Sequence, residues 1–151
     1  MGEVLAVCIS DRRGIQKEPV DAIECARGLG IRGDAHGGDW HRQISLLSDE
    51  SVEQMRRRGT CIPPGGFAEN VLTRGIDLRN LRVGCRLKVG GSVVLEITQI
   101  GKQCHQGCAI YRAAGDCVMP REGIFCTVIE DGSVRAGDRI DVIPDSLAGA
   151  Q

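Results

Sequence analysis

Glycine divides this chain into short segments. Its 151 residues include 21 glycines, and the stretches between them suit strands better than helices. Only the stretch 48–58 has the features of a good helix, and 77–81 fits a single helical turn. Many short strands at even spacing, with one or two short helices, are typical of a β-barrel rather than a βαβ fold. The sequence therefore predicts an all-β, barrel-type fold with no internal repeat.

The expected strands are apolar or alternating segments bounded by turn signals. They cover 4–10, 20–26, 42–47, a short stretch near 71, 86–89, 93–100, 124–130, 133–134 and 139–143. Gly90-Gly91 and Asp131-Gly132 are two-residue hairpin signals, and the second is the stronger one. In 93–100 apolar residues alternate with polar ones, which predicts one buried and one exposed face.

The segment 48–58 carries a helix start signal and a charge order that suits a helix. Ser48 is of the residue type preferred at an N-cap. Acidic residues fill 49–50 and basic residues fill 56–58, which complements the helix dipole. Leu47 and Val52 have the spacing of a hydrophobic staple. We therefore expect a short surface helix whose narrow apolar stripe covers the sheet.

Length and composition indicate one small domain. A chain of this size buries roughly 70% of the surface that its unfolded form exposes. We expect a single domain over 1–143 and a polar, disordered tail over 144–151. The N-terminus lacks the basic and apolar regions of a signal peptide, and no apolar run approaches the roughly 20 residues of a membrane span. These features predict a cytoplasmic protein with reduced thiols and no membrane partner.

Charge and aromatic content argue against nucleic-acid binding. The formal net charge is −1, and the chain has four aromatic residues. A nucleic-acid partner would usually need a basic face or a set of aromatic rings on which bases stack. We therefore expect no nucleic-acid partner.

Half of the eight cysteines lie between 104 and 126, with a histidine beside the first of them. In a reducing compartment, clustered cysteines more often serve metal binding or catalysis than disulfides. Cys104 follows a strand and a Gly-Lys pair, and the nearby Lys102 and His105 would favour its thiolate. We predict that Cys104 is the reactive residue.

The remaining cysteines leave three interpretations open. Cys108 and Cys117 could form a zinc site with Cys104 and His105, since thiolate and imidazole together suit zinc, although Cys-x3-Cys is a weak match to zinc-site spacing. They could equally be resolving thiols for a modified Cys104, or pack as small apolar residues. Three further cysteines are expected in the core: Cys8, Cys25 and Cys126.

Four motifs follow one another along the chain. The first is GDAHGG at 33–38 followed by RQISLL at 42–47, and the second is GGFAENVLT at 65–73 continuing into GIDL at 75–78. The third is ITQIGKQC at 97–104, and the fourth is REGIF at 121–125. Together the motifs and the residues between them cover roughly 3–143, and in this order they resemble the MOSC domain, named for the C-terminal domain of molybdenum-cofactor sulfurase.

The resemblance implies a compact MOSC-type β-barrel with a functional cysteine at Cys104. Members look like sulfur carriers or molybdenum-cofactor-binding modules. In the first role Cys104 would accept a persulfide from a cysteine desulfurase, and the pyridoxal phosphate would belong to that partner. In the second it would ligate molybdenum, as in relatives that reduce N-hydroxylated compounds. A separate protein, the electron donor, would then have to supply electrons, because the chain shows no appended electron-transfer domain.

The resemblance also selects polar residues that could hold the cofactor. Arg42, Asn70, Lys102 and Arg121 lie in or beside the matching motifs and are the candidates for binding a phosphate or pterin group. An alternative is a structural ion pair of Arg42 or Arg121 with a glutamate at 69 or 122. A third possibility for function is a non-enzymatic zinc module. For the accessory pair Asp34 and His36, we favour a hydrogen-bonding or structural role over metal ligation.

Overall fold

The structure is a computed structural model that describes residues 2–13, 15–57, 59, 62–101 and 123–144. Its elements are β1 (Gly2–Ile9), β2 (Glu18–Val20), β3 (Ile23–Ala26), β4 (Gly30–Ile31), β5 (Ile44–Ser48), α1 (Asp49–Arg57), β6 (Val71–Arg74), the 3₁₀ turn η1 (Leu78–Asn80), β7 (Arg86–Val89), β8 (Val93–Ile100), β9 (Ile124–Glu130), β10 (Gly132–Val134) and β11 (Arg139–Val142).

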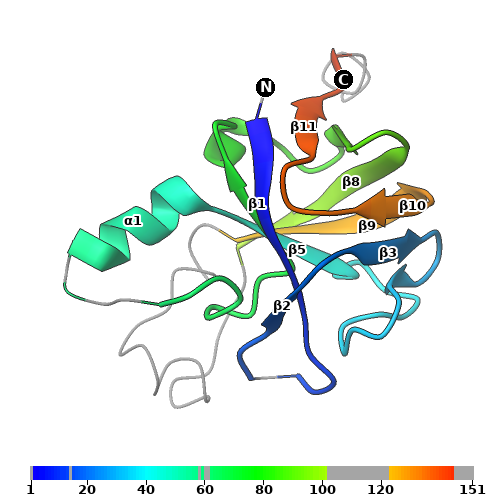
Figure 1. The fold of residues 1–151 in the computed structure, drawn as a ribbon. Coiled ribbons are helices and arrows are strands. Elements are labelled where there is room, and N and C mark those ends of the chain that lie inside the picture. The colour runs from blue at the N-terminus through cyan, green and yellow to red at the C-terminus, as the bar shows by residue number, and fades with distance from the viewer. Residues whose placement is uncertain (1, 14, 58, 60–61, 102–122, 145–151) are drawn as a thin grey trace.

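Seven strands close into a barrel (Figure 1). Their order around the barrel is β11, β7, β8, β9, β5, β6 and β1. Antiparallel pairing of β1 with β11, at Gly2 with Ile140 and Glu3 with Arg139, joins the two ends. Strand β2 pairs with β1 outside this ring. The predicted all-β barrel is confirmed, and α1 and η1 are its short helices.

The barrel contains one parallel pair that the sequence did not predict. Strands β5 and β6 run parallel, with Leu46 beside Val71 and Leu47 beside Leu72, and α1 lies between them in the chain. A parallel pair needs a crossover connection, which α1 and the loop after it supply. The barrel is therefore not built from antiparallel hairpins alone.

Helix α1 begins as the sequence predicts. Ser48 Oγ accepts a hydrogen bond from the backbone N–H of Ser51 at 3.2 Å, as an N-cap does. Leu47 and Val52 are both buried in the same apolar cluster. The helix also buries Met55. Its apolar stripe therefore packs on the sheet while its charged residues face outward.

Two details of the predicted strands were wrong. The single strand expected over 20–26 is two strands: β2 pairs with β1, and β3 pairs with β10 and β4 in a separate three-stranded sheet. Asp131-Gly132 does not close a hairpin, because β10 leaves β9 and pairs with β3, with Val134 beside Ile23. Asp131 Oδ1 accepts the N–H of Arg27 at 2.6 Å and so ties this corner to the small sheet. Long-range pairing here outweighs the local turn signal.

Two apolar clusters lie on opposite faces of the barrel wall. Leu46 belongs to the cluster that fills the barrel, and its neighbour Leu47 belongs to the one beneath α1 and the 65–69 turn. Successive residues of a strand point to opposite faces, so β5 contributes to both. The cysteines that the structure describes, Cys8, Cys25, Cys85 and Cys126, are all buried, which confirms the three core placements.

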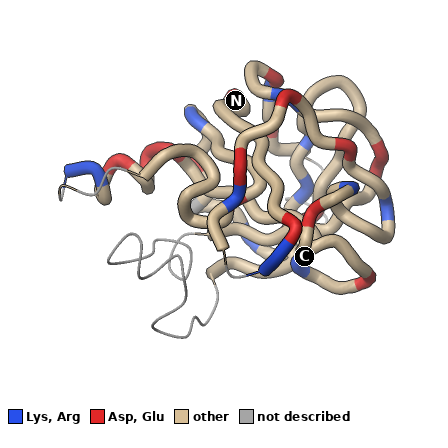
Figure 2. The backbone as a smooth tube through the Cα atoms, turned by 60° about the horizontal axis from the view of Figure 1, so that its bottom comes forward, with Lys and Arg blue, Asp and Glu red and all other residues tan. Residues whose placement is uncertain are grey.

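Charges of both signs are interspersed along the chain, including along α1 (Figure 2). Among the residues that the structure describes, no helix has both the length and the apolar character needed to cross a membrane.

Strand β8 allows a matched test of the barrel interior. The side chain of Ile97 is fully buried, whereas that of Ile100 in the same strand is 41% exposed. We expect Ile97→Ala to lower the free energy of unfolding by about 2–5 kcal/mol, because it leaves a cavity. Ile100→Ala should cost less than about 1 kcal/mol. Denaturant titration measures both, and equal losses would contradict the placement of the interior.

Candidate functional site

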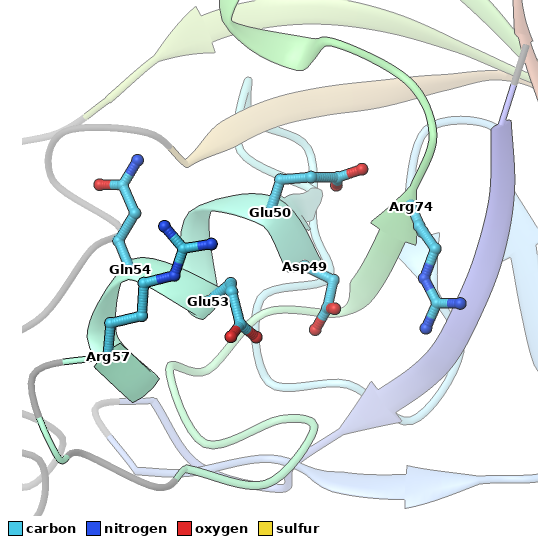
Figure 3. A pocket seen from close by; sticks show the side chains of 6 residues that line it. All are labelled: Asp49, Glu50, Glu53, Gln54, Arg57 and Arg74. Atoms are coloured by element: carbon cyan, nitrogen blue, oxygen red, sulfur yellow. The ribbon is translucent and has the colours of Figure 1, made fainter.

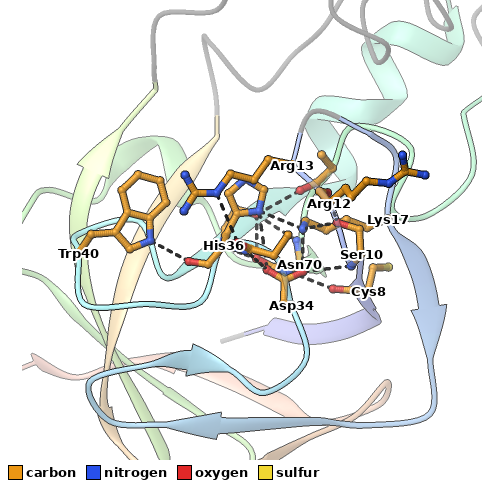
Figure 4. A network of polar contacts seen from close by, with 12 residues as sticks. Cys8, Ser10, Arg12, Arg13, Lys17, Asp34, His36, Trp40 and Asn70 are labelled. Carbon is orange, nitrogen blue, oxygen red and sulfur yellow. Dashed lines mark hydrogen bonds and ion pairs between the residues drawn. The ribbon is translucent and has the colours of Figure 1, made fainter.

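A buried ion pair lies where the loop after β1 meets the turn after β4 (Figure 4). Lys17 Nζ is 2.7 Å from Asp34 Oδ1, and both side chains are 0% exposed. The Lys17 ammonium also lies 3.0 Å from Ser10 Oγ and 3.0 Å from His36 Nδ1. Two segments that are separate in the sequence therefore contribute to one polar network.

Asp34 is held ionised by its partners. Its Oδ1 accepts hydrogen bonds from the Ser10 N–H at 3.1 Å and from Lys17, and its Oδ2 accepts the His36 N–H at 3.0 Å. Burial alone would raise the pKa of Asp34, but its interactions with His36 and Lys17 outweigh burial and hold the pKa well below the usual carboxyl range. The sequence analysis favoured such a hydrogen-bonding role for this residue.

The turn 33–38 is fixed to β1 and to the loop that follows it. The Ala35 N–H donates to the Ser10 carbonyl at 2.8 Å, and Trp40 Nε1 donates to the His36 carbonyl at 2.7 Å. Gly33 adopts a positive φ of 83°, which a residue with a side chain rarely does. The glycines of this motif therefore serve the backbone path that places Asp34 and His36.

Trp40 contacts aromatic and cationic side chains next to the Lys17–Asp34 network. The guanidinium carbons of Arg13 and Arg42 lie 4.6 and 4.7 Å from the centroid of its ring. Arg42 also lies 5.7 Å from the ring of Phe125. The His36 ring is parallel to that of Trp40, with centroids 6.4 Å apart. The ring of His41 meets the same indole edge-on, with centroids 5.8 Å apart, so two cations and two histidines surround Trp40.

Arg42 carries an unsatisfied polar atom. Its Nε is buried and has no hydrogen-bond partner within the part of the chain that the structure describes. The alternative ion pair with Glu69 is not formed, since that carboxylate accepts the N–H groups of Gly65 and Phe67 at 2.9 and 3.1 Å. A buried donor without a partner is rare and points to a ligand or to another segment of the chain.

Residues 40–42 lie against the strands that flank 102–122. Thr98 Oγ1 hydrogen-bonds to the His41 carbonyl, and it also donates to the Phe125 carbonyl at 3.1 Å. The Gly101 N–H donates to the Gly123 carbonyl at 2.7 Å. The end of β8 and the start of β9 are thus joined beside the Trp40 cluster. Cys104 follows Gly101 by three residues in the sequence.

The second motif approaches the same network from another side. The Lys17 N–H donates to the Gly65 carbonyl at 2.8 Å. A Cβ added at Gly65 would lie 2.1 Å from the Lys17 carbonyl oxygen, so no side chain fits there. Burial raises the pKa of Glu69, while the N–H groups of the turn and the charge of Lys17 oppose this effect.

Asn70 lies in the interior and joins two strands. Its Oδ1 accepts the N–H of Ser45 at 2.9 Å, and its Nδ2 donates to the Cys8 carbonyl at 3.0 Å. The residue is fully buried. Its amide therefore holds β1 against β5. These hydrogen bonds are not made to residues of the Trp40 cluster.

The other predicted site residues lie outside the described residues: Lys102, Cys104, His105, Cys108, Cys117 and Arg121. Of the predicted set, the structure brings together Asp34 and His36, with Arg42 on the neighbouring Trp40. Lys17 was missed. Nothing local marks it, because a lysine between charged and polar residues is usually exposed, and only the folded chain shows its burial.

The buried thiols offer little reactivity. Burial, aided by Glu69, raises the pKa of Cys8 to about 12, and burial likewise raises the pKa of Cys25 to about 12. Burial also raises the pKa of the Cys126 thiol. Because the thiolate is the nucleophile, these cysteines are poor candidates for chemistry. Within the described residues, no three His, Cys, Asp or Glu side chains are grouped as metal ligands.

A cavity of about 310 Å³ lies elsewhere, along α1 (Figure 3). It is lined by Asp49, Glu50, Glu53, Gln54, Arg57 and Arg74. Two of its carboxylates, those of Asp49 and Glu53, pair with Arg56 at 2.8 and 2.9 Å. Neither Lys17 nor Trp40 lines it, so it is separate from the polar network.

The fold and the network define a small closed β-barrel with a cationic, partly buried polar site among its loops. The family model of the MOSC domain matches residues 32–141. Since the match covers more than half of the chain, the protein belongs to the MOSC domain family.

Solved structures share this fold. The YuaD protein from Bacillus subtilis is similar, with a TM-score of 0.76 and 24% identity over 94% of this chain and 96% of that one. YiiM from Geobacillus stearothermophilus has a TM-score of 0.71 and 16% identity, over 95% and 75% of the two chains. YiiM from Escherichia coli has a TM-score of 0.63 and 17% identity, over 94% and 68%. No curated protein matches the sequence significantly.

Removal of the Asp34 charge tests the network. The pKa of Asp34 is lower in the folded protein than the ordinary value of about 3.9, so its ionised form stabilises the fold above that pH, and this contribution is lost on acidification. Asp34→Asn should cost about 3–5 kcal/mol at neutral pH, because Lys17 loses its buried counter-charge. It should also flatten the decline in stability below about pH 4.

Asp39→Asn is the control, because Asp39 is an exposed aspartate of the same loop. The free energy of unfolding is measured for both variants and for the wild type at several pH values. If Asp34→Asn is as stable as Asp39→Asn and keeps the wild-type pH dependence, the ion pair has no stabilising role.

Proposed function

We propose that this protein handles the molybdenum cofactor, with Cys104 carrying sulfur as a persulfide or ligating the metal. Membership of the MOSC domain family supports a role connected with this cofactor. The structural observation that carries the proposal is Arg42, whose buried Nε lacks a partner among the described residues. Its guanidinium lies against Trp40 and Phe125, and it stands beside the strands that flank the Cys104 segment.

The donor groups fit an anionic cofactor. A guanidinium presents several N–H groups in a planar fork that matches phosphate. Arg42 would hold the phosphate of the cofactor, together with Lys102 and Arg121. Asn70 has a supporting role in this proposal, because its amide joins β1 to β5. When bound, the cofactor would supply the molybdenum centre for redox or sulfur chemistry.

In the sulfur-carrying role, Cys104 acts as a nucleophile. Its thiolate attacks the terminal sulfur of a persulfide on a cysteine desulfurase, whose pyridoxal phosphate belongs to that partner. A new sulfur–sulfur bond forms on Cys104, the bond to the desulfurase cysteine breaks, and that cysteine leaves as a thiolate. A nucleophile of the acceptor, such as a molybdenum-cofactor enzyme, then attacks the terminal sulfur, the sulfur–sulfur bond on Cys104 breaks, and Cys104 leaves as a thiolate. The high pKa values of Cys8 and Cys25 favour Cys104 over those thiols as the carrier.

Intact mass tests the carrier role. We expect incubation with a cysteine desulfurase and cysteine to add the mass of one sulfur atom to the wild-type chain, and to add nothing to Cys104→Ser. Cys108→Ser, in the same segment, should still take up sulfur. Undiminished uptake by Cys104→Ser would rule out this residue as the carrier.

Elemental analysis separates the alternatives. Molybdenum and pterin that co-purify with the wild type, and are lost in Cys104→Ser, would favour stable cofactor binding. The protein would then be a subunit of an oxidoreductase for N-hydroxylated compounds, with a separate electron donor. Near-stoichiometric zinc that disappears in Cys108→Ser would replace both roles with a non-enzymatic zinc module.

A further inference from the structure

The Lys17 ammonium fixes how His36 can hydrogen-bond. An ammonium group only donates, and it has three N–H bonds. Lys17 Nζ lies 2.7 Å from Asp34 Oδ1, 3.0 Å from Ser10 Oγ and 3.0 Å from His36 Nδ1. Nδ1 of His36 must therefore accept. A ring that accepts at Nδ1 is neutral and carries its proton on Nε2.

Lys17 is a nearer polar partner of this ring nitrogen than Asp34 is. His36 Nδ1 is 3.7 Å from Asp34 Oδ2, which is too long for a hydrogen bond. That oxygen is instead occupied by the His36 backbone N–H at 3.0 Å. The carboxylate keeps Lys17 charged, and Lys17 in turn keeps the Nδ1 lone pair engaged.

Part of the His36 side chain is exposed. The His36 side chain is 21% exposed, whereas those of Lys17 and Asp34 are 0% exposed. Among the described residues, Nε2 of His36 has no hydrogen-bond partner, while Nδ1 is held by Lys17. The buried pair of Lys17 and Asp34 thus orients His36 so that the Nε2–H donor lies at the partly exposed side of the network.

The surroundings of this donor suit a negative charge. The guanidinium groups of Arg13 and Arg42 lie over Trp40, whose ring is parallel to that of His36. Arg13 also donates from Nε to the Ala35 carbonyl at 3.3 Å, which holds it close to the turn that carries His36 (Figure 4). The nearby carboxylate of Asp34 is paired with Lys17 and also accepts the N–H groups of Ser10 and His36. An oxyanion would meet donors and positive charge here.

We propose that His36 donates a hydrogen bond from Nε2 to an oxyanion, and that Lys17 and Asp34 are positioning residues that fix this tautomer. The site takes a phosphate-type group, with Arg13 and Arg42 as its cationic neighbours. The inference rests on the proposed function only in assigning that group to the cofactor. The tautomer and the affinity for an oxyanion follow from the network itself.

Nitrogen NMR of the ¹⁵N-labelled protein tests the tautomer directly. The signals of His36, identified by their loss in His36→Gln, should show the Nε2–H tautomer at neutral pH. In Lys17→Met both tautomers should appear, whereas Lys17→Arg, which also only donates, should keep the wild-type pattern. A wild-type Nδ1–H tautomer, or an unchanged pattern in folded Lys17→Met, overturns the positioning role. If Lys17→Met does not fold, the wild-type tautomer decides.

Titration with inorganic phosphate tests the donor. Phosphate should shift the His36 ring signals saturably. His36→Leu should weaken phosphate binding by about fivefold or more, the loss expected for one hydrogen bond. His36→Gln, which retains an N–H near the position of Nε2, should stay within about twofold of wild type. His41→Gln is the control, because the exposed His41 side chain pairs with Gln99 instead.

Failure of this inference differs from failure of the proposed function. A chain that takes up no sulfur at Cys104 and holds no molybdenum, yet binds phosphate at His36, refutes the cofactor role and supports the oxyanion site. Absence of any phosphate effect on His36 refutes the oxyanion site and leaves the Cys104 experiments to decide the function.

Discussion

The buried ion pair of Lys17 and Asp34 is the constraint on which the arrangement of the loops depends. A lysine with no exposure must keep a counter-charge, because an unpaired buried ammonium is very unfavourable. The pair therefore fixes the loop after β1 against the turn after β4. The same lysine, through its backbone N–H, also fixes the 65–69 turn. Two motifs, 33–38 and 65–73, thus meet the loop after β1 at one residue.

The barrel wall separates two apolar clusters, and one of them lies next to the turn that bonds to Lys17. One fills the interior, and the other lies between the barrel wall, α1 and the 65–69 turn. Because β5 and β6 are parallel, the connection between them, which includes α1, passes over that outer cluster. The turn 65–69 is consequently held between apolar packing on one side and Lys17 on the other. The packing of the wall therefore helps to place the 65–69 turn beside Lys17.

Local patterns predicted much of the fold. The strands 86–89, 93–100 and 124–130 and the capped helix after Ser48 were predicted within a residue or two, because each depends on alternation, turns or capping within a few positions. The parallel pairing of β5 with β6 and the pairing of β10 with β3 were not predicted. Those pairings are decided by partners distant in sequence, which outweighed the Asp131-Gly132 turn signal.

The sequence identified some residues of the site but not all of them. Asp34, His36 and Arg42 could be selected because they lie in family motifs, whereas their partner Lys17 could not. Its neighbours in the sequence give no sign of burial, and its role exists only through contacts with residues 7, 17 and 19 positions away. For Asn70 the motif indicated importance, and the structure shows a bridge between β1 and β5. The prediction for Cys104 concerns a residue outside the described part of the chain.

The seam between β1 and β11 has a consequence for how the barrel opens. Among the described residues, two residue pairs join these strands, Gly2 with Ile140 and Glu3 with Arg139, and backbone hydrogen bonds of Val4 extend the junction. Strands β8 and β9, by contrast, are paired along most of their length. Local opening begins where the fewest contacts must be broken. The seam involves the first residues of β1, while Ser10 and Lys17 follow its other end. Fraying at this closure would therefore begin at the end of β1 that lies away from the Lys17–Asp34 network.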